Sequence, residues 1–162
     1  MIEILYEDNH IIAVNKKSGD LVQGDKTGDT PLPEMVKDYL RTRYKKPGNI
    51  FCGVIHRLDR PVSGLVLFAK TSKALRRMNE LFRNKTIQKT YWAIVENPPA
   101  NKFGKLEHYL IKNEKTNKSQ AFVKPFDRAI FSVLHYKTLK KLDRYTLLEV
   151  KPVTGRHHQI RV

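Results

Sequence analysis

The sequence predicts an α+β fold in which a large mixed, mostly antiparallel sheet is flanked by a few helices. Two stretches in the first half have apolar residues at helical spacing, whereas the second half consists mainly of short strand-like segments. The length of 162 residues is typical of one domain, and 40% of the residues are hydrophobic. We therefore expect residues 1–162 to form a single domain.

The chain is expected to open with a hairpin, because the apolar segments 2–6 and 10–15 flank the polar turn 7–9. Residues 18–29 contain three glycines and several charged residues, which favours a loop.

Two helices are expected in the first half. Thr30 is the expected N-cap of the first, Pro31 suits its first helical position, and the helix should run to about Tyr44. The second is expected to be capped by Ser72 and to reach about Asn84. Each has an apolar face at helical spacing.

The remaining segments predict strands separated by polar turns. One strand is expected at 65–69, before the second helix. The strands expected in the second half are 88–95, 105–111, 119–124, 131–140 and 145–151.

Charge is the strongest global signal. The 31 Lys and Arg against 16 Asp and Glu give a net charge of +15 and a pI near 10.0, which favours nucleic acid as the partner. No apolar run approaches the ~18 residues of a membrane span, so no membrane partner is expected. The single cysteine, Cys52, cannot form an internal disulfide, and the acidic first eight residues do not form a secretory signal. A cytoplasmic location is expected.

One carboxylate, Asp59, lies in a basic loop between two apolar runs. Arg57 and Arg60 flank it. Pro61 restricts the backbone after it, and Gly64 allows the backbone conformations that end the loop. Such a loop suits catalysis on a rigid scaffold, and Asp59 is the candidate nucleophile. In isolation, an R-x-D-R sequence is more often a surface carboxylate paired with arginines, so the assignment depends on the rest of the chain.

Three segments stand out together. Residues 56–64 read H-R-L-D-R-P-V-S-G, residues 89–95 read K-T-Y-W-A-I-V, and residues 154–162 read T-G-R-H-H-Q-I-R-V. Their order and spacing resemble the RluA-like family of RNA pseudouridine synthases. The family pattern H-R-L-D-x-x-[TS]-S-G is met except at Val62, where Thr is usual. The patterns K-x-Y-x-A-x-V and G-R-x-H-Q-I-R-V are met.

The resemblance implies a pseudouridine-synthase-like catalytic domain that isomerises specific uridines in ribosomal or transfer RNA, without a metal or other cofactor. The bond from ribose to the ring nitrogen is cut, the uracil turns, and carbon 5 is joined instead. Asp59 is implied as the essential carboxylate, which either adds covalently to the sugar or base or assists loss of the base. Either role suits an aspartate, whose unperturbed pKa of about 3.9 keeps it ionised at neutral pH.

Two further catalytic residues are implied by the resemblance. Tyr91 matches the tyrosine that stacks under the target uracil and takes the proton from carbon 5. Arg161 matches the basic residue that pairs with the catalytic aspartate and would hold it ionised and oriented. Judged alone, Tyr91 would be a packing residue and Arg161 an ordinary strand arginine.

Three pairs of basic residues are expected to contact RNA: Arg57 with Arg60, Arg156 with His158, and Arg76 with Arg77. The first pair flanks Asp59 and suits phosphate contacts or filling the space left by an extruded base. The second pair, with His157, suits the RNA path or a brace for the loop. The third pair lies on the polar face of the second expected helix, which either tracks phosphates or is simply solvated.

A metal-dependent nuclease is the competing enzyme class, because His56, Asp59, His157 and His158 could converge on an ion. If their segment is a strand, however, adjacent His157 and His158 lie on its opposite faces and would rarely share an ion. No H-x-H or C-x-x-C pair supports a site. We expect no metal.

The third motif reaches Val162, so the resemblance implies that the C-terminal part of the catalytic domain is missing. An open sheet edge and incomplete cover near Asp59 would follow. The alternative function is therefore a catalytically inactive RNA-binding fragment or domain, since binding depends on distributed charge whereas isomerisation needs an assembled pocket. A monomer is expected.

Overall fold

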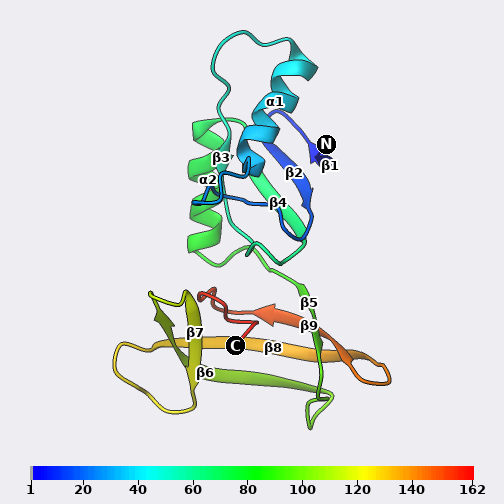
Figure 1. Cartoon of the computed structure of the whole chain (residues 1–162), viewed down its shortest axis with the longest axis vertical. Coiled ribbons are helices and arrows are strands. Elements are labelled where there is room, and N and C mark those ends of the chain that lie inside the picture. The colour runs from blue at the N-terminus through cyan, green and yellow to red at the C-terminus, as the bar shows by residue number, and fades with distance from the viewer. Residues whose placement is uncertain (1) are drawn as a thin grey trace. The chain divides into compact units, whose positions relative to one another are not determined.

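The computed structural model describes residues 2–162, which form two compact units that divide between Thr86 and Ile87 (Figure 1). Each unit has its own antiparallel sheet, and both helices lie in the first unit. The predicted α+β class is confirmed, although the strands are divided between two sheets. That the two units together form one catalytic domain stays a prediction. Within the described part of the chain, no helix is long and apolar enough to cross a membrane.

The first unit contains four strands and two helices. In chain order they are β1 (Glu3–Glu7), β2 (Ile11–Lys16), α1 (Leu32–Tyr44), β3 (Gly53–Val54), β4 (Gly64–Ala69) and α2 (Ser72–Arg83). The sheet order is β1-β2-β4-β3, and every neighbouring pair is antiparallel. The short strand β3 was not predicted, because two residues carry no readable alternation.

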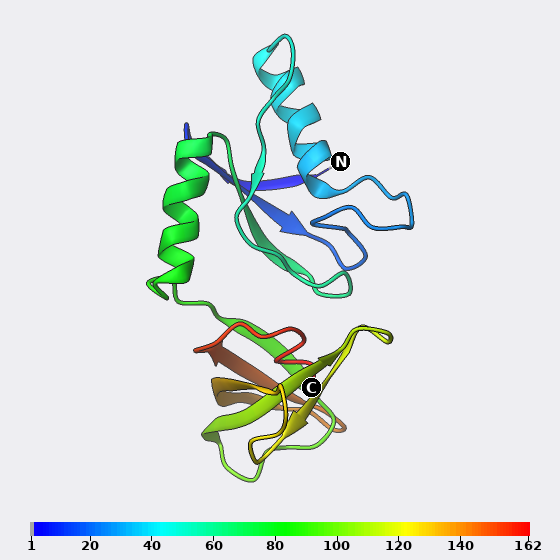
Figure 2. The same ribbon diagram turned by 90° about the vertical axis from the view of Figure 1, so that its left-hand side faces the viewer.

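Alternating side chains give this sheet two buried faces, and the helices lie on opposite sides of it (Figure 2). The side chains buried most completely between the sheet and α1 are Ile12, Val14, Leu32, Val36, Val66 and Phe68. Each contributes about 1.5–3 kcal/mol by leaving water. The face toward α2 is smaller and centres on Ile55, Ala69 and Ala74.

Both predicted helix caps are wrong by one residue. Pro31 occupies the N-cap position of α1 without a side-chain hydrogen bond, so Thr30 does not cap it. Thr71 caps α2, because its Oγ1 accepts a hydrogen bond from the Ala74 N–H at 3.1 Å. The consecutive hydroxyl residues Thr71 and Ser72 both suit a cap, and only the extended backbone at Thr71 (φ −142°, ψ 153°) decides between them.

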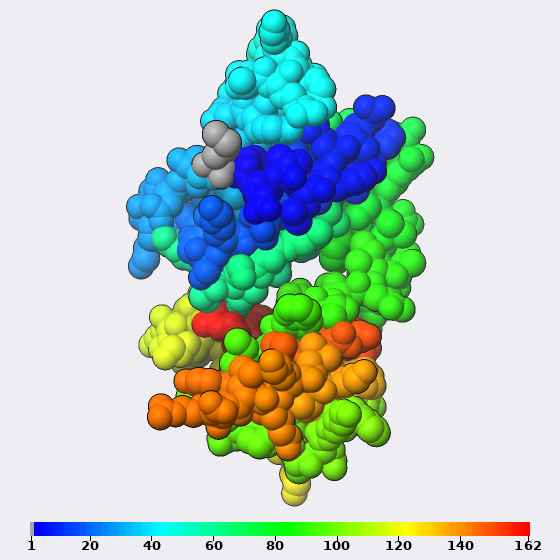
Figure 3. Space-filling view, turned by 90° about the vertical axis from the view of Figure 1, so that its right-hand side faces the viewer, coloured from blue at the N-terminus to red at the C-terminus, as the bar shows by residue number. Residues whose placement is uncertain are grey.

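Glu7, at the end of edge strand β1, joins the sheet to α1. Its carboxylate accepts hydrogen bonds from Lys70 Nζ at 2.6 Å, Tyr44 Oη at 2.7 Å and Tyr39 Oη at 3.1 Å. The side chains of Glu7 and Lys70 are each 10% exposed. Burial alone would raise the pKa of Glu7, but the hydrogen bonds from Lys70 and the two tyrosines outweigh it and lower that pKa. Figure 3 shows β1 in dark blue at the surface of the first unit.

We expect Glu7→Gln to lower the free energy of unfolding by about 1.5–3 kcal/mol at neutral pH, because hydrogen bonds to a charged group are removed. Since the folded-state pKa of Glu7 is lowered, its contribution is complete above the ordinary value of 4.5 and is lost as pH falls through the folded-state pKa. Denaturant titrations of both proteins across this range measure the difference. A difference that stays constant down to the acid limit would contradict the assignment.

Cys52 packs half-buried against the core beside α1, and burial raises the pKa of its thiol to about 12. Because the thiolate is the reactive form, we expect the native protein to react very slowly with a thiol reagent at neutral pH, and the denatured chain to react fully. Labelling of the native protein at the rate of a free cysteine would show that this core opens readily.

The second unit contains five strands, which are β5 (Tyr91–Val95), β6 (Phe103–Asn113), β7 (Lys118–Phe122), β8 (Ile130–Lys141) and β9 (Thr146–Pro152). Their order is β5-β9-β8-β6-β7, with antiparallel pairing throughout. The five predicted strands are confirmed, with shifted ends.

The two faces of this sheet differ in how far their side chains are buried. The inner face carries the buried cluster of Leu134, Leu148 and Val150, against which Tyr91 packs. The outer face is the opposite one. It carries Trp92, which is 73% exposed.

Candidate active site

Asp59 lies in the loop between β3 and β4 and is half-buried. Its carbonyl oxygen accepts a hydrogen bond from the Val62 N–H at 3.0 Å, which closes a tight turn. The turn leads into β4 through Gly64, whose φ of +135° is a conformation that residues with a side chain rarely adopt. The motif glycine is therefore required by the backbone.

Lys16 holds this turn from the end of β2. Its side chain is fully buried, and Nζ donates to the carbonyl oxygens of Val62 at 2.6 Å, Arg60 at 3.0 Å and Lys17 at 3.1 Å. Three acceptors match the three N–H donors of an ammonium group, so the site fits the charged form. Burial lowers the pKa of Lys16, while nearby carboxylates, including that of Asp59, oppose this shift. A fixed positive charge thus lies near Asp59.

The residues after Lys16 add two further hydrogen bonds to the turn. Ser18 Oγ donates to the Pro61 carbonyl at 2.9 Å, and the Gly19 N–H donates to the Arg60 carbonyl at 2.8 Å. Together with Lys16, they bind the three consecutive carbonyls that follow Asp59. The turn is consequently held through its backbone. A Val in place of the usual Thr at position 62 leaves these contacts available.

His56 anchors the other side of the loop. Its Nε2 accepts a hydrogen bond from the Leu67 N–H of β4 at 3.1 Å, and its ring stacks on Phe82 of α2 with a centroid distance of 5.1 Å. Because Nε2 accepts, the ring proton of the neutral form is on Nδ1. His56 thus acts as a structural contact of the Asp59 loop.

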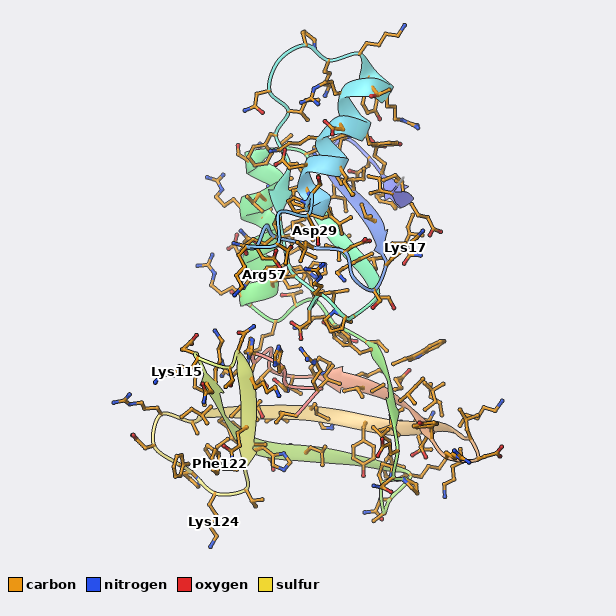
Figure 4. All side chains as sticks on the ribbon, viewed as in Figure 1. Lys17, Asp29, Arg57, Lys115, Phe122 and Lys124 are labelled. Carbon is orange, nitrogen blue, oxygen red and sulfur yellow. The ribbon has the colours of Figure 1, made fainter. Side chains whose placement is uncertain are left out.

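The two arginines beside Asp59 contact the preceding loop, residues 18–29. Arg60 forms ion pairs with Asp29 at 2.5 Å and Asp25 at 3.5 Å, and Arg57 Nη1 donates to Gln23 Oε1 at 2.6 Å. Figure 4 labels Arg57 and Asp29 in this region of the first unit. RNA contacts by either arginine therefore require these interactions to be exchanged or extended, and their RNA-binding role stays a prediction.

The supporting role of Lys16 was missed by sequence reasoning, which ended the strand at residue 15. A signal was present, because Ile12, Val14 and Lys16 share one face at the strand period of two. A lysine on the buried side of a strand indicates a specific partner for its charge.

Tyr91 begins β5 and lies opposite Val150 of β9. It is half-buried and packs against the inner-face cluster, together with Ile160 of the third motif. The second and third motifs therefore meet at one cluster of the second unit.

The third motif forms consecutive turns, so His157 and His158 do not lie in a strand. Backbone hydrogen bonds join Gln159 N to Arg156 O at 3.1 Å and Arg161 N to His158 O at 2.9 Å. The two histidine rings stack at 3.7 Å instead of lying on opposite faces.

Gln159 explains the turn conformation. Its Oε1 accepts from Thr154 Oγ1 at 2.8 Å and from the Arg156 N–H at 2.9 Å, while its Nε2 donates to the Val133 carbonyl at 2.9 Å. Ser119 Oγ donates to the His157 carbonyl at 2.8 Å and lies 2.8 Å from Nδ1 of the same residue. These side-chain contacts, which periodicity cannot show, replace a sheet ladder.

The predicted catalytic residues are divided between the units. Asp59 belongs to the first, whereas Tyr91 and the exposed Arg161 belong to the second. Their meeting at one catalytic centre stays a prediction.

The remaining predicted RNA contacts are mostly at the surface. Arg76 and Arg77 lie exposed on α2. Arg156 is exposed, and its Nε donates to the Phe131 carbonyl at 3.0 Å. His158 is half-buried with a φ of 53°. Among residues 2–162, no group of three or more His, Cys, Asp or Glu side chains is arranged to hold a metal ion.

Solved structures of the same fold define the class of this architecture as that of pseudouridylate synthase domains. The human protein RNA Pseudouridylate Synthase Domain Containing 4 matches 98% of this chain and 62% of its own with a TM-score of 0.81 at 23% identity. Human RNA Pseudouridylate Synthase Domain Containing 1 matches 100% of this chain and 63% of its own with a TM-score of 0.79 at 20% identity.

The sequence profile of the family described as RNA pseudouridylate synthase matches residues 10–162, and the chain belongs to this family. It is 36% identical over 159 residues to a ribosomal large subunit pseudouridine synthase C of Vibrio vulnificus, covering 98% of this chain and 47% of the relative. It is 33% identical over 175 residues to a tRNA pseudouridine synthase C of Pectobacterium carotovorum, covering 99% and 44%. The chain thus spans about half the length of these relatives.

Proposed function

We propose that this chain carries the catalytic region of an RNA pseudouridine synthase that isomerises uridines in ribosomal or transfer RNA, with Asp59 as the catalytic carboxylate. The observation that carries the proposal is the backbone support of the Asp59 turn, in which Lys16, Ser18 and Gly19 bind three consecutive carbonyls. Preorganisation of this kind suits a residue that must meet a reacting atom within a fraction of an ångström.

The reaction rearranges one nucleoside and needs no external reactant. The bond between ribose carbon 1′ and uracil nitrogen 1 breaks, carbon 1′ joins carbon 5, the proton on carbon 5 leaves, and nitrogen 1 gains a proton. Asp59 acts as nucleophile or as stabiliser of the positive charge that develops at the anomeric carbon. We assign Tyr91 to removal of the carbon 5 proton, and Arg161 to pairing with the catalytic carboxylate.

The names of the relatives support RNA as the substrate class, since one refers to the large ribosomal subunit and another to tRNA. The net charge of +15 supports the same class of partner. Uridines in single-stranded or loop regions are favoured, because extruding a paired base costs a few kcal/mol.

The test uses RNA that carries tritium at carbon 5 of uridine. Because this hydrogen must leave during isomerisation, release of tritium to water by the purified chain would support the proposal. RNA binding without tritium release would instead favour the alternative, an RNA-binding region without turnover. The same assay on a chain of the relatives' length would then show whether the additional residues are required for turnover.

Replacing both Arg76 and Arg77 by Ala is expected to weaken RNA binding at low salt and to reduce the slope of log affinity against log salt by up to about 1.4, or about 0.7 for each single-strand phosphate that the variant no longer neutralises. Fluorescence anisotropy of labelled RNA over a salt series measures the slope. Arg41→Ala with Arg43→Ala, two exposed positions of α1, is the matched control. Equal slopes for all three proteins would show that this face of α2 is only solvated.

A further inference from the structure

The outer face of the second sheet exposes three large apolar side chains. Trp92 and Phe103 are each 73% exposed, and Ile94 is 68% exposed. The described residues of the second unit contain no helix. Exposed patches of this kind mark binding surfaces in soluble proteins.

The strand register arranges the outer face in rows. The first row crosses four strands and consists of Trp92, Glu149, Lys137 and Phe103. The next row on the same face consists of Lys151, His135 and Lys105. A third, more distant row is aromatic and consists of Phe131, Tyr109 and Phe122, of which Figure 4 labels Phe122 on β7. Two rows with aromatic side chains thus lie on either side of the row of Lys151, His135 and Lys105, and about 20 Å separates these two rows along β6.

The charges on this face favour an anionic partner. Its two carboxylates are each paired with a lysine, Glu149 with Lys151 at 3.2 Å and Glu107 with Lys105 at 2.6 Å. Lys137 lies between Glu149 and Phe103 in the first row. Lysine and glutamate are depleted at the centres of protein interfaces, whereas basic side chains among aromatic ones are typical of single-stranded RNA platforms.

We propose that the outer face binds single-stranded RNA, with bases stacked on Trp92 and Phe103 and a phosphate bound by Lys137. The choice of RNA as the ligand rests on the proposed function. The outer face would be a second RNA-contacting surface, on the side of the sheet opposite Tyr91. All four bases can stack on an aromatic ring. The outer face would therefore bind the RNA strand that flanks the modified uridine without preference for the sequence of that strand.

Trp92 makes the proposal directly testable, because it is the only tryptophan of the chain. Titration of the full chain with single-stranded oligouridine is expected to quench tryptophan fluorescence, with a midpoint that moves to higher RNA concentration as salt is added. Phe103→Ala should weaken binding about five- to a hundredfold. Lys137→Ala should lower the salt slope by about 0.7. Tyr6→Ala, an aromatic residue of the first unit that is 54% exposed, is the matched control and should leave the titration unchanged.

Circular dichroism of each variant separates loss of binding from loss of folding. RNA binding by anisotropy without a change in Trp92 fluorescence, or equal affinities for Phe103→Ala and Tyr6→Ala, would overturn the proposal. Concentration-dependent dimers that bury Trp92 in the absence of RNA would also overturn it, in favour of a second copy as the occupant. Tritium release reports the proposed function independently, because oligouridine binding on the outer face does not require turnover.

Discussion

Asp59→Asn is expected to lower tritium release from carbon 5-labelled uridine RNA by on the order of a thousandfold or more, while RNA affinity stays within a few-fold of the parent. The amide keeps the shape of the side chain but removes the negative charge that either catalytic route requires. The surrounding turn should persist, because its hydrogen bonds to Lys16, Ser18 and Gly19 use backbone carbonyls.

Asp38→Asn is the matched control, since Asp38 lies on α1 with its side chain 70% exposed. Tritium release and anisotropy are measured on the same RNA for all three proteins. Undiminished release by Asp59→Asn would remove Asp59 from the mechanism. A parallel loss of release and of RNA affinity would instead make it a binding residue.

Lys16→Met is expected to lower the free energy of unfolding by about 3–5 kcal/mol, because three backbone carbonyls lose the charged donor of a fully buried side chain. The carbonyls of Lys17 and Arg60 keep a second hydrogen bond, from the N–H groups of Asp20 and Gly19. The methionine fills most of the volume, so the loss reports the ammonium group. We further expect the turn at Asp59 to become mobile and tritium release to fall more than a hundredfold.

Lys17→Met is the control for this prediction, because Lys17 is the exposed neighbour on the same strand end (Figure 4). Denaturant titration gives the change in stability, and hydrogen exchange of the Val62 amide, which donates to the Asp59 carbonyl, reports the turn. If Lys16→Met unfolds the chain, Lys16→Arg serves as the second variant. Unchanged protection of the Val62 amide in a folded variant would show that Lys16 does not hold the turn.

Local sequence patterns predicted most of the secondary structure. Leu32, Val36 and Leu40 recur at helical spacing, and the α1 end at Tyr44 agrees with the prediction. Strand positions were also predictable, since Tyr91, Ala93 and Val95 alternate with Trp92 and Ile94. Caps and strand ends were less predictable, because at Thr71 and Ser72 two neighbouring side chains offer the same hydrogen bond and the backbone chooses one.

At the candidate site, too, some features were predictable from the sequence and others were not. The sequence singled out Asp59 and Tyr91 through motif spacing, but their roles stay predictions. His56 and His157 were weighed as metal ligands, and the structure gives them other partners, the Leu67 amide and Ser119. Such partners are distant in the sequence, so no local pattern could name them.

The sequence by itself determined the α+β class, the basic character of the chain, the family and the loop that carries Asp59. Each of these depends on residue type and spacing along the chain. Only the tertiary structure decided that the strands form two sheets, that Lys16 holds the Asp59 turn, and that the third motif is a series of turns braced by Gln159. The physical reason is that a buried donor takes whichever acceptor the fold brings within reach, and chain separation does not limit that choice.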